Sequence, residues 1–153
     1  MAKRWFNCRV RYEKTGENGM TKKVSEQYLV DALSFTEAEA RIIEEMKPFM
    51  QGEFEVTAIA LVALSELFPS TALDDDKWYK VRVAFVTLDE RSGHEKRARQ
   101  YMMVAAHSTE HAERRLHECM KGTLADYVVE AVVETPVVDV FPYELEPETE
   151  NTK

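Results

Sequence analysis

Two short stretches of the chain combine a tryptophan with basic residues at alternate positions, a pattern that could contact nucleic acid. Residues 5–12 read WFNCRVRY, and residues 78–85 read WYKVRVAF. Aromatic rings can stack on bases while cations follow phosphates, a combination typical of proteins that bind single strands. The predicted contact residues are the outward members of each stretch and the basic residues across the following turn: Trp5, Arg9, Arg11, Lys22, Lys23, Trp78, Lys80, Arg82, Lys96 and Arg97.

Positive charge is concentrated around these two stretches, although the chain as a whole is acidic. The net charge is −8, which by itself argues against a nucleic-acid partner. Residues 1–25 nevertheless hold seven Lys or Arg against two Glu, and residues 77–100 hold seven against three acidic residues. The two segments therefore carry +5 and +4, which leaves −17 on the rest of the chain. This asymmetry is more informative than the total charge.

The two stretches begin two copies of a longer repeat, which cover residues 5–69 and 78–142. Residues 19–24 (GMTKKV) correspond to residues 93–98 (GHEKRA), and the copies close on LFP and VFP. A solenoid needs three or more stacked units, so a two-copy repeat predicts a pseudo-twofold domain instead. The predicted organisation is a single domain over residues 1–142, with a linker at 70–77 and a disordered acidic tail at 143–153.

Hydrophobic periodicity predicts the same order of elements in each copy: strand, strand, helix, strand. In the first strand, period-2 alternation turns the apolar residues toward a core and the basic residues away from it. Thr36 and Thr109 are the expected N-caps of the two helices, and Pro48 should end the first helix near Lys47. The predicted fold is therefore α+β, with an antiparallel sheet and the two helices on one of its faces.

Other residues with chemical potential are expected to be structural. The sequence has no glycine-rich phosphate-binding motif, no HExxH and no paired CxxC. His107 and His111 have the i, i+4 spacing of two metal ligands on one helical face, but the first copy lacks them, so we expect surface or capping histidines. Residues 74–76 (DDD) are expected to form a solvated linker, and Cys8 and Cys119 are expected to be buried free thiols. The sequence thus predicts no enzyme, no metal and no cofactor.

Two functions remain open at this point. The first is non-catalytic binding of single-stranded DNA or RNA through the twinned Trp, Lys and Arg surfaces. The second is a structural or adaptor role, in which sheet edges or the LFP and VFP arms bind another protein or a second copy of the chain. No apolar run approaches the roughly 18 residues that cross a membrane, and the N-terminus lacks a secretory signal. We therefore expect a cytoplasmic protein without a membrane partner.

Several runs of the sequence resemble a known family. They are residues 17–41 (ENGMTKKVSEQYLVDALSFTEAEAR), residues 77–83 (KWYKVRV) and residues 139–143 (DVFPY). Together they resemble domain of unknown function 4494, a family frequent in gut Bacteroidales and in their phages and mobile elements. The resemblance covers the chain up to Tyr143 and implies a bacterial or phage cytoplasmic protein, but it carries no established activity. At the level of architecture alone, the duplicated sheet-plus-helix unit is similar to folds of the coactivator type that bind single-stranded DNA.

Overall fold

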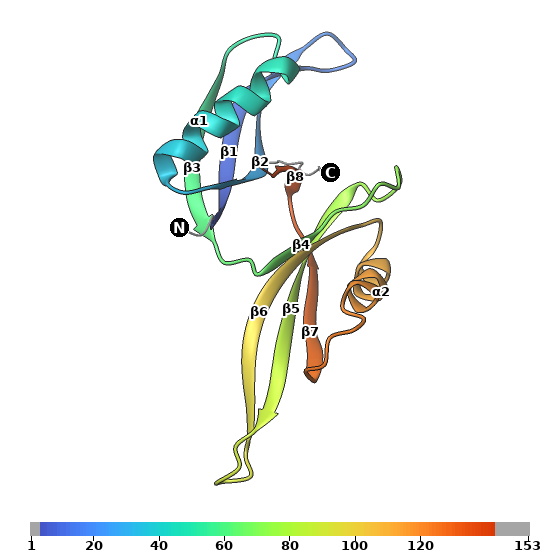
Figure 1. Ribbon diagram of the computed structural model, residues 1–153. Coiled ribbons are helices and arrows are strands. Elements are labelled where there is room, and N and C mark those ends of the chain that lie inside the picture. The colour runs from blue at the N-terminus through green and yellow to red at the C-terminus, as the bar shows by residue number, and fades with distance from the viewer. Residues whose placement is uncertain (1–3, 143–153) are drawn as a thin grey trace, which may run out of the picture. The chain divides into compact units, whose positions relative to one another are not determined.

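The computed structural model describes residues 4–142, so the predicted tail at 143–153 lies outside the described residues. Within residues 4–142 the fold is α+β, with two α-helices and two four-stranded sheets. The chain divides into two compact units, the first formed by residues 4–62 and 137–142 and the second by residues 63–136. Each unit holds one sheet and one α-helix (Figure 1). Neither of the described helices is long and apolar enough to cross a membrane.

The first unit is built on a long β-hairpin. Gly19 adopts a positive φ of 79° in its turn, a conformation that glycine reaches without steric cost. The third strand pairs antiparallel with the first, and a short strand from the end of the chain pairs parallel with the second, which gives the order β3-β1-β2-β8. The elements are β1 (Arg4–Thr15), β2 (Thr21–Ala32), α1 (Phe35–Met46), the 3-10 turn η1 (Lys47–Phe49), β3 (Phe54–Val62) and β8 (Val137–Phe141).

Helix α1 covers one face of this sheet (Figure 1). The alternation in β1 buries Phe6, Cys8 and Val10 against the apolar stripe of the helix, which includes Ile42 and Met46. This face is the core of the first unit, as the period-2 pattern predicts. The opposite side of the sheet has no helix in the described residues.

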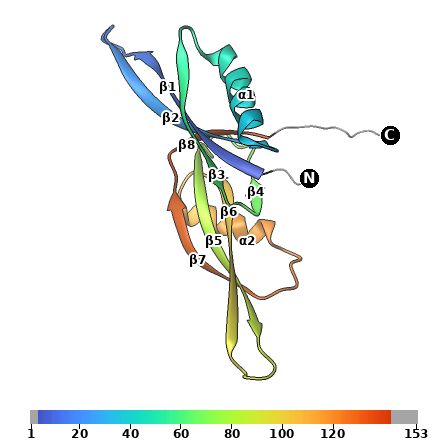
Figure 2. The ribbon, with the colours of Figure 1, turned by 90° about the vertical axis from the view of Figure 1, so that its left-hand side faces the viewer.

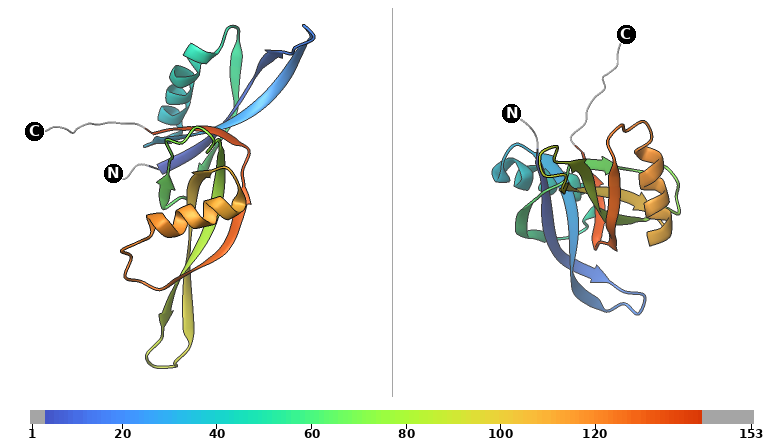
Figure 3. Two further views of the ribbon diagram at one scale, coloured as in Figure 1. Left: turned by 90° about the vertical axis from the view of Figure 1, so that its right-hand side faces the viewer. Right: turned by 90° about the horizontal axis from the view of Figure 1, so that it is seen from below.

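The second unit repeats this arrangement. Its strands have the order β7-β5-β6-β4, with β5 and β6 as the hairpin, β7 antiparallel to β5, and β4 parallel to β6. Helix α2 packs across β5, β6 and β7 (Figure 3). The elements are β4 (Glu66–Phe68), β5 (Lys77–Leu88), β6 (Glu95–Ala106), α2 (Thr109–Cys119) and β7 (Tyr127–Glu134).

The hairpin of the second unit is longer than the sheet that contains it. Strand β5 pairs with β6 from Lys77 to Leu88, whereas β7 pairs with β5 from Tyr79 to Phe85. The hairpin therefore continues past the end of β7 as a two-stranded ribbon (Figure 2). This ribbon carries Lys96 and Arg97 of β6, which pair with Thr87 and Val86 beyond the last residue of β5 that pairs with β7.

The helix caps differ from those predicted. Ser34, not Thr36, caps α1: its Oγ accepts the Glu37 N–H at 3.1 Å, and Glu37 Oε1 accepts the Leu33 N–H at 2.9 Å. Ser108 caps α2 in the same way. Each serine lies upstream of the predicted threonine, so each helix begins earlier than the sequence reading placed it. Serine caps at least as well as threonine, so residue type alone gave no reason to place the cap at the threonine.

The closing arms of the two repeats contribute to each other's sheets. Strand β4, which ends the first repeat, pairs with β6, and Phe68 packs against the core of the second unit. Strand β8, which ends the second repeat, pairs with β2, and Phe141 stacks on Tyr28 with ring centroids 5.7 Å apart. The compact units therefore cut across the repeat boundaries at 5–69 and 78–142, because each hairpin binds the arm of the other copy along its free edge.

Candidate nucleic-acid interface

The strand register assigns the predicted contact residues of the first unit to its two faces. Residues directly opposite in an antiparallel pair lie on the same face. Arg9 pairs with Gln27, Arg11 with Ser25, and Glu13 with Lys23, and all lie on the side opposite the core residues Phe6 and Val10. We call this side the open face of the first sheet. Trp5, Arg9, Arg11 and Lys23 share it, whereas Lys22, which pairs with Lys14, lies on the other face.

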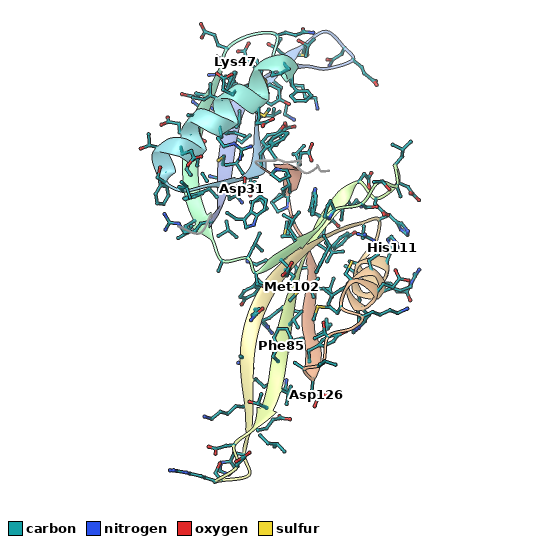
Figure 4. All side chains as sticks on the ribbon, in the orientation of Figure 1. Asp31, Lys47, Phe85, Met102, His111 and Asp126 are labelled. Atoms are coloured by element: carbon teal, nitrogen blue, oxygen red, sulfur yellow. The ribbon has the colours of Figure 1, made fainter. Side chains whose placement is uncertain are left out.

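The second sheet has a corresponding open face. Phe85 and Met102 (labelled in Figure 4) lie on the face that packs toward α2, where Met102 joins a core cluster with Leu116. Residues at alternate positions of β5 and β6 point away from this face. Trp78, Lys80, Arg82 and Arg97 share this open face of the second sheet, whereas Lys96, which pairs with Thr87, lies on the helix side.

The structure shows that Trp78 is largely buried. Its side chain lies on the predicted face, but the residue is only 8% exposed, which leaves little of its ring accessible to a base. Its neighbour across the hairpin is Ala105, a small residue that is itself buried. A tryptophan at the start of a strand is often buried, as Trp78 is here. Trp5, its counterpart, is half-buried.

An aromatic residue that the sequence reading missed lies further along the same face. Tyr101 pairs with Arg82 across the hairpin, and its ring is half-buried. The ammonium group of Lys80 lies over this ring, 4.6 Å from its centroid. The face therefore keeps an accessible aromatic ring next to cations, but the ring is a tyrosine on the return strand. The alternation Arg97, Arg99, Tyr101 along β6 was the sequence signal that could have revealed it.

Three arginines of this face converge on one carboxylate. Arg82 Nε lies 3.1 Å from Glu130 Oε1, and Arg97 Nη1 lies 2.8 Å from Glu130 Oε2. Arg99, which was not among the predicted residues, donates through Nε at 2.7 Å and through Nη2 at 3.3 Å. The three arginine side chains are 36–54% exposed, whereas the Glu130 side chain is 11% exposed.

A β-bulge places Glu130 at the centre of this cluster. The β5–β7 register steps from Arg82 opposite Ala131 to Val83 opposite Val129, so Glu130 is the extra residue on β7. Bulges re-aim a side chain relative to the regular pleat. The first sheet has a bulge at the corresponding place, where the extra residue is Thr57. The sequence hairpin pattern cannot locate a bulge, so it could not predict this convergence.

The cluster fixes the charge state of its members. Hydrogen bonds from Arg99 and then Arg97 lower the pKa of the Glu130 carboxyl to about 2. The same hydrogen bonds raise the pKa values of Arg97 and Arg99 further above their usual range. Glu130, Arg97 and Arg99 are therefore charged near neutral pH. The paired strand residues of this face, together with the bulge residue, present four cations (Lys80, Arg82, Arg97, Arg99) and two carboxylates (Glu95, Glu130).

The open face of the first sheet is less positive. Arg11 forms an ion pair with Glu55, and Lys23 lies directly opposite Glu13. A cavity of about 650 Å³ lies beside them, between the hairpin and the segment that leads into β3. Two cations (Arg11, Lys23) and three carboxylates (Glu13, Glu53, Glu55) line it. This balance disfavours an anionic ligand in the cavity. Arg9, another predicted contact residue of this face, pairs with Gln27 and Ala58 and does not line the cavity.

Comparison with known proteins identifies the family. A search of curated proteins finds no match to the chain. A family model described as domain of unknown function (DUF4494) matches residues 4–143. That match covers both units and nearly the whole sequence, and the chain therefore belongs to the DUF4494 family.

Proposed function

We propose that the chain is a non-catalytic protein that binds single-stranded DNA or RNA, with the open face of the second sheet as its main contact surface. The observation that carries this proposal is the group of three arginines beside the exposed part of Tyr101. Cations follow the phosphates and the ring stacks on a base in this mode of binding. The open face of the first sheet, with Trp5 and Arg9, offers the same kind of contacts in the first copy.

The arginine cluster keeps hydrogen-bonding capacity for phosphate. Each guanidinium has five N–H donors, and Glu130 receives one from Arg82, one from Arg97 and two from Arg99. The remaining donors belong to side chains that are one-third to one-half exposed. Glu130 therefore orders the guanidinium groups before binding, which reduces the conformational entropy that a phosphate contact would cost.

The role of stacking residue passes from Trp78 to Tyr101 in this proposal. A base that stacks on the accessible side of Tyr101 would displace the Lys80 ammonium group, which lies 4.6 Å from the ring centroid. The displaced cation would remain within reach of the flanking phosphate, because lysine has a long, flexible side chain. Stacking on an aromatic ring contributes about 1–3 kcal/mol per base.

We also infer that the chain arose by duplication and has a pseudo-twofold arrangement. The identical strand orders of the two sheets, and the bulges at corresponding positions of β3 and β7, support this inference. A duplicated surface offers the same kind of contact twice in one chain. We assign the protein to the cytoplasm of a bacterium, or of a bacterial cell that carries a phage or mobile element.

The test is a binding titration with fluorescently labelled oligo-dT and oligo-U of about 20 nucleotides. Fluorescence anisotropy at about 50 and about 200 mM NaCl separates the contribution of phosphate contacts to the affinity from that of stacking, since phosphate binding weakens steeply with salt. The Arg97→Ala/Arg99→Ala double variant should lower the affinity by tenfold or more, and should reduce the salt slope by about 1.4, or about 0.7 per lost phosphate contact.

The matched control is the Arg114→Ala/Lys121→Ala double variant. It removes the same charge from exposed positions on and just after α2, away from the open face. Its affinity should change by less than about twofold. No binding at low salt, or an equal loss of affinity in both double variants, would rule out the proposed surface.

A second candidate function is supported by the outer edge of the second sheet. Strand β7 ends the strand order, and its Val133 side chain is 57% exposed on the open face. An unpaired edge with exposed apolar residues can add a strand from another protein. This adaptor function predicts a complex that forms without nucleic acid. Light scattering and a pull-down with nuclease-treated extract test it, and Val133→Lys should abolish the complex.

A further inference from the structure

Three potential metal ligands from separate parts of the sequence meet in the second unit. Asp75 lies in the loop between β4 and β5, and His107 directly precedes the cap of α2. His111, which is labelled in Figure 4, lies in the first turn of α2. One ligand atom from each residue lies within 4.8 Å of the other two. The sequence predicted that residues 74–76 form a solvated linker and that the histidines are surface or capping residues. The linker prediction is wrong for Asp75, whose side chain is buried.

Asp75 is a buried carboxylate that is only half satisfied. Its side chain is 5% exposed. Oδ2 accepts a hydrogen bond from Ser70 Oγ at 2.5 Å, but no group in residues 4–142 donates a hydrogen bond to Oδ1. Leaving a buried charged oxygen without a partner is costly. Oδ1 instead faces the imidazole of His111, with Nδ1 at 3.4 Å.

The loop around Asp75 holds this orientation. Ser70 Oγ also accepts the Ala72 N–H at 3.1 Å, and the Asp75 N–H donates to the Ala72 carbonyl at 3.1 Å. Ser70 therefore fixes the carboxylate from behind, as an outer hydrogen-bond partner fixes a metal-binding carboxylate. The loop is a built structure that aims one oxygen at the two histidines.

His111 Nδ1 has two neighbours with conflicting requirements. Asp75 Oδ1 requires a proton on this nitrogen, whereas the His107 N–H, at 3.4 Å, requires its lone pair. One ring nitrogen cannot meet both requirements at once. A cation on the Nδ1 lone pair would pair with the anionic oxygen of Asp75, and it would replace the long His107 N–H contact of 3.4 Å. The His107 ring already stacks on the His111 ring, with centroids 3.9 Å apart.

The geometry points to a binding site for a divalent first-row transition-metal ion. We propose that Asp75 Oδ1, His111 Nδ1 and a ring nitrogen of His107 bind one Zn²⁺-like ion, with water in the remaining position. Two imidazoles and one carboxylate suit zinc and its neighbours, whereas Mg²⁺ and Ca²⁺ prefer oxygen ligands. Ligand atoms on one tetrahedral zinc ion lie about 3.3 Å apart, given bond lengths of about 2.0–2.1 Å. Rotation of the exposed His107 side chain can close the remaining distance.

Such an ion would fasten the loop that carries Asp75 to the start of α2. That loop connects β4 to β5, so the ion would stabilise the join between the incoming arm and the hairpin of the second unit. Metal binding to the folded form alone raises apparent stability in proportion to the logarithm of free metal concentration. The role inferred here is structural and is independent of nucleic-acid binding.

The experiment uses untagged full-length protein, stripped of metal with a chelator and titrated with ZnCl₂ by calorimetry. We expect one ion per chain. His107→Ala, His111→Ala and Asp75→Asn should each weaken binding by tenfold or more, since loss of even an outer partner costs about 10–100-fold. His94→Ala, an exposed histidine in the β5–β6 turn, is the matched control and should change affinity by less than about twofold.

A second measurement keeps the test valid if the buried Asp75 variant folds poorly. Zinc should shift the imidazole NMR signals of His107 and His111 and leave those of His94 and His117 in place. The competing site is His117, whose Nε2 lies 3.6 Å from Glu113. The proposal is overturned if His117→Ala abolishes zinc binding while His107→Ala does not. It is also overturned if the protein does not bind zinc at about 100 µM.

Discussion

Arg99 binds Glu130 side-on, with Nε 2.7 Å from one carboxylate oxygen and Nη2 3.3 Å from the other. This two-point contact fixes the plane of the guanidinium as well as its position. It joins the return strand of the hairpin to the bulge of β7, since Arg99 belongs to β6 and Glu130 is the extra residue opposite Arg82. The same carboxylate both orders the arginines and competes with any phosphate that approaches them.

The competition between Glu130 and phosphate gives the first prediction. Glu130→Gln removes one negative charge from the middle of three arginines. We expect single-stranded DNA to bind about fivefold more tightly, because one unit charge about 4 Å away in water contributes about 1 kcal/mol. Fluorescence anisotropy at low salt measures the change. Glu118→Gln, an exposed position on α2, removes the same charge elsewhere and should have a smaller effect. A loss of affinity in Glu130→Gln would mean that preorganisation outweighs charge.

The pKa of Glu130 gives a prediction for acid stability. Its folded pKa of about 2 lies below the usual value of 4.5, so the ionised carboxylate stabilises the folded state above pH 4.5. That contribution is lost as the pH falls from about 4.5 to about 2. The difference in stability between wild type and Glu130→Gln should therefore be largest near pH 6 and should shrink near pH 3. Urea midpoints at the two pH values measure it, and an equal difference at both would contradict the arginine pairing.

The regular part of the fold could be predicted from the sequence because its causes are local. Period-2 alternation in β1 and β5 identified the core face, with Phe6, Val10 and Val83 buried as expected. Glycines at the hairpin turns located the connections, and Gly19 and Gly93 both adopt positive φ. These features depend on residues a few positions apart, which is the range over which sequence patterns operate.

The features that could not be predicted depend on distant partners. The repeat indicated that LFP and VFP are corresponding segments. It could not predict that each of them pairs with the hairpin of the other copy, as β4 and β8 do. The cluster around Glu130 needed the bulge register, and Asp75 met His107 and His111 through a loop with no periodic signal. Trp78 occupies its predicted face and is still buried, because a position on a face does not determine what covers it.

The arm of the first sheet gives a prediction for local stability. Phe141 stacks on Tyr28 and packs against the core of the first unit. Phe141→Ala should destabilise the docking of β8 by about 2–3 kcal/mol, less than the 3–5 kcal/mol of a fully buried phenylalanine, because its side chain is half-buried. Hydrogen exchange should then speed up at Tyr28–Val30, the part of β2 that pairs with Asp139–Phe141 of β8.

The control for the arm is Val138→Ala, at an exposed position of the same strand. It retains the backbone pairing and removes little buried surface, so exchange in β2 should remain within about twofold of the wild type. Protection of β2 that survives Phe141→Ala unchanged would show that the ring does not anchor the arm.

The two cysteines give a prediction for chemical reactivity. Both were expected to be buried, but Cys119 is exposed at the end of α2, whereas Cys8 is fully buried in β1. Burial raises the pKa of the Cys8 thiol to about 12, and the positive charge of Arg41 opposes this increase only in part. The thiolate is the reactive form, so at neutral pH a thiol reagent should modify Cys119 rapidly and leave Cys8 intact in the native protein.

Titration with a chromogenic disulfide reagent checks this. The native chain should show one fast thiol, and the chain in denaturant should show two. Cys119→Ser should remove the fast native reaction, whereas Cys8→Ala should leave it unchanged. The raised pKa of Cys8 also makes stability depend on pH. The neutral thiol favours the folded state below pH 9, and this contribution to stability is lost as the pH rises from 9.0 toward about 12. Equal native rates at the two thiols would contradict the burial of Cys8, and with it the packing of β1 against α1.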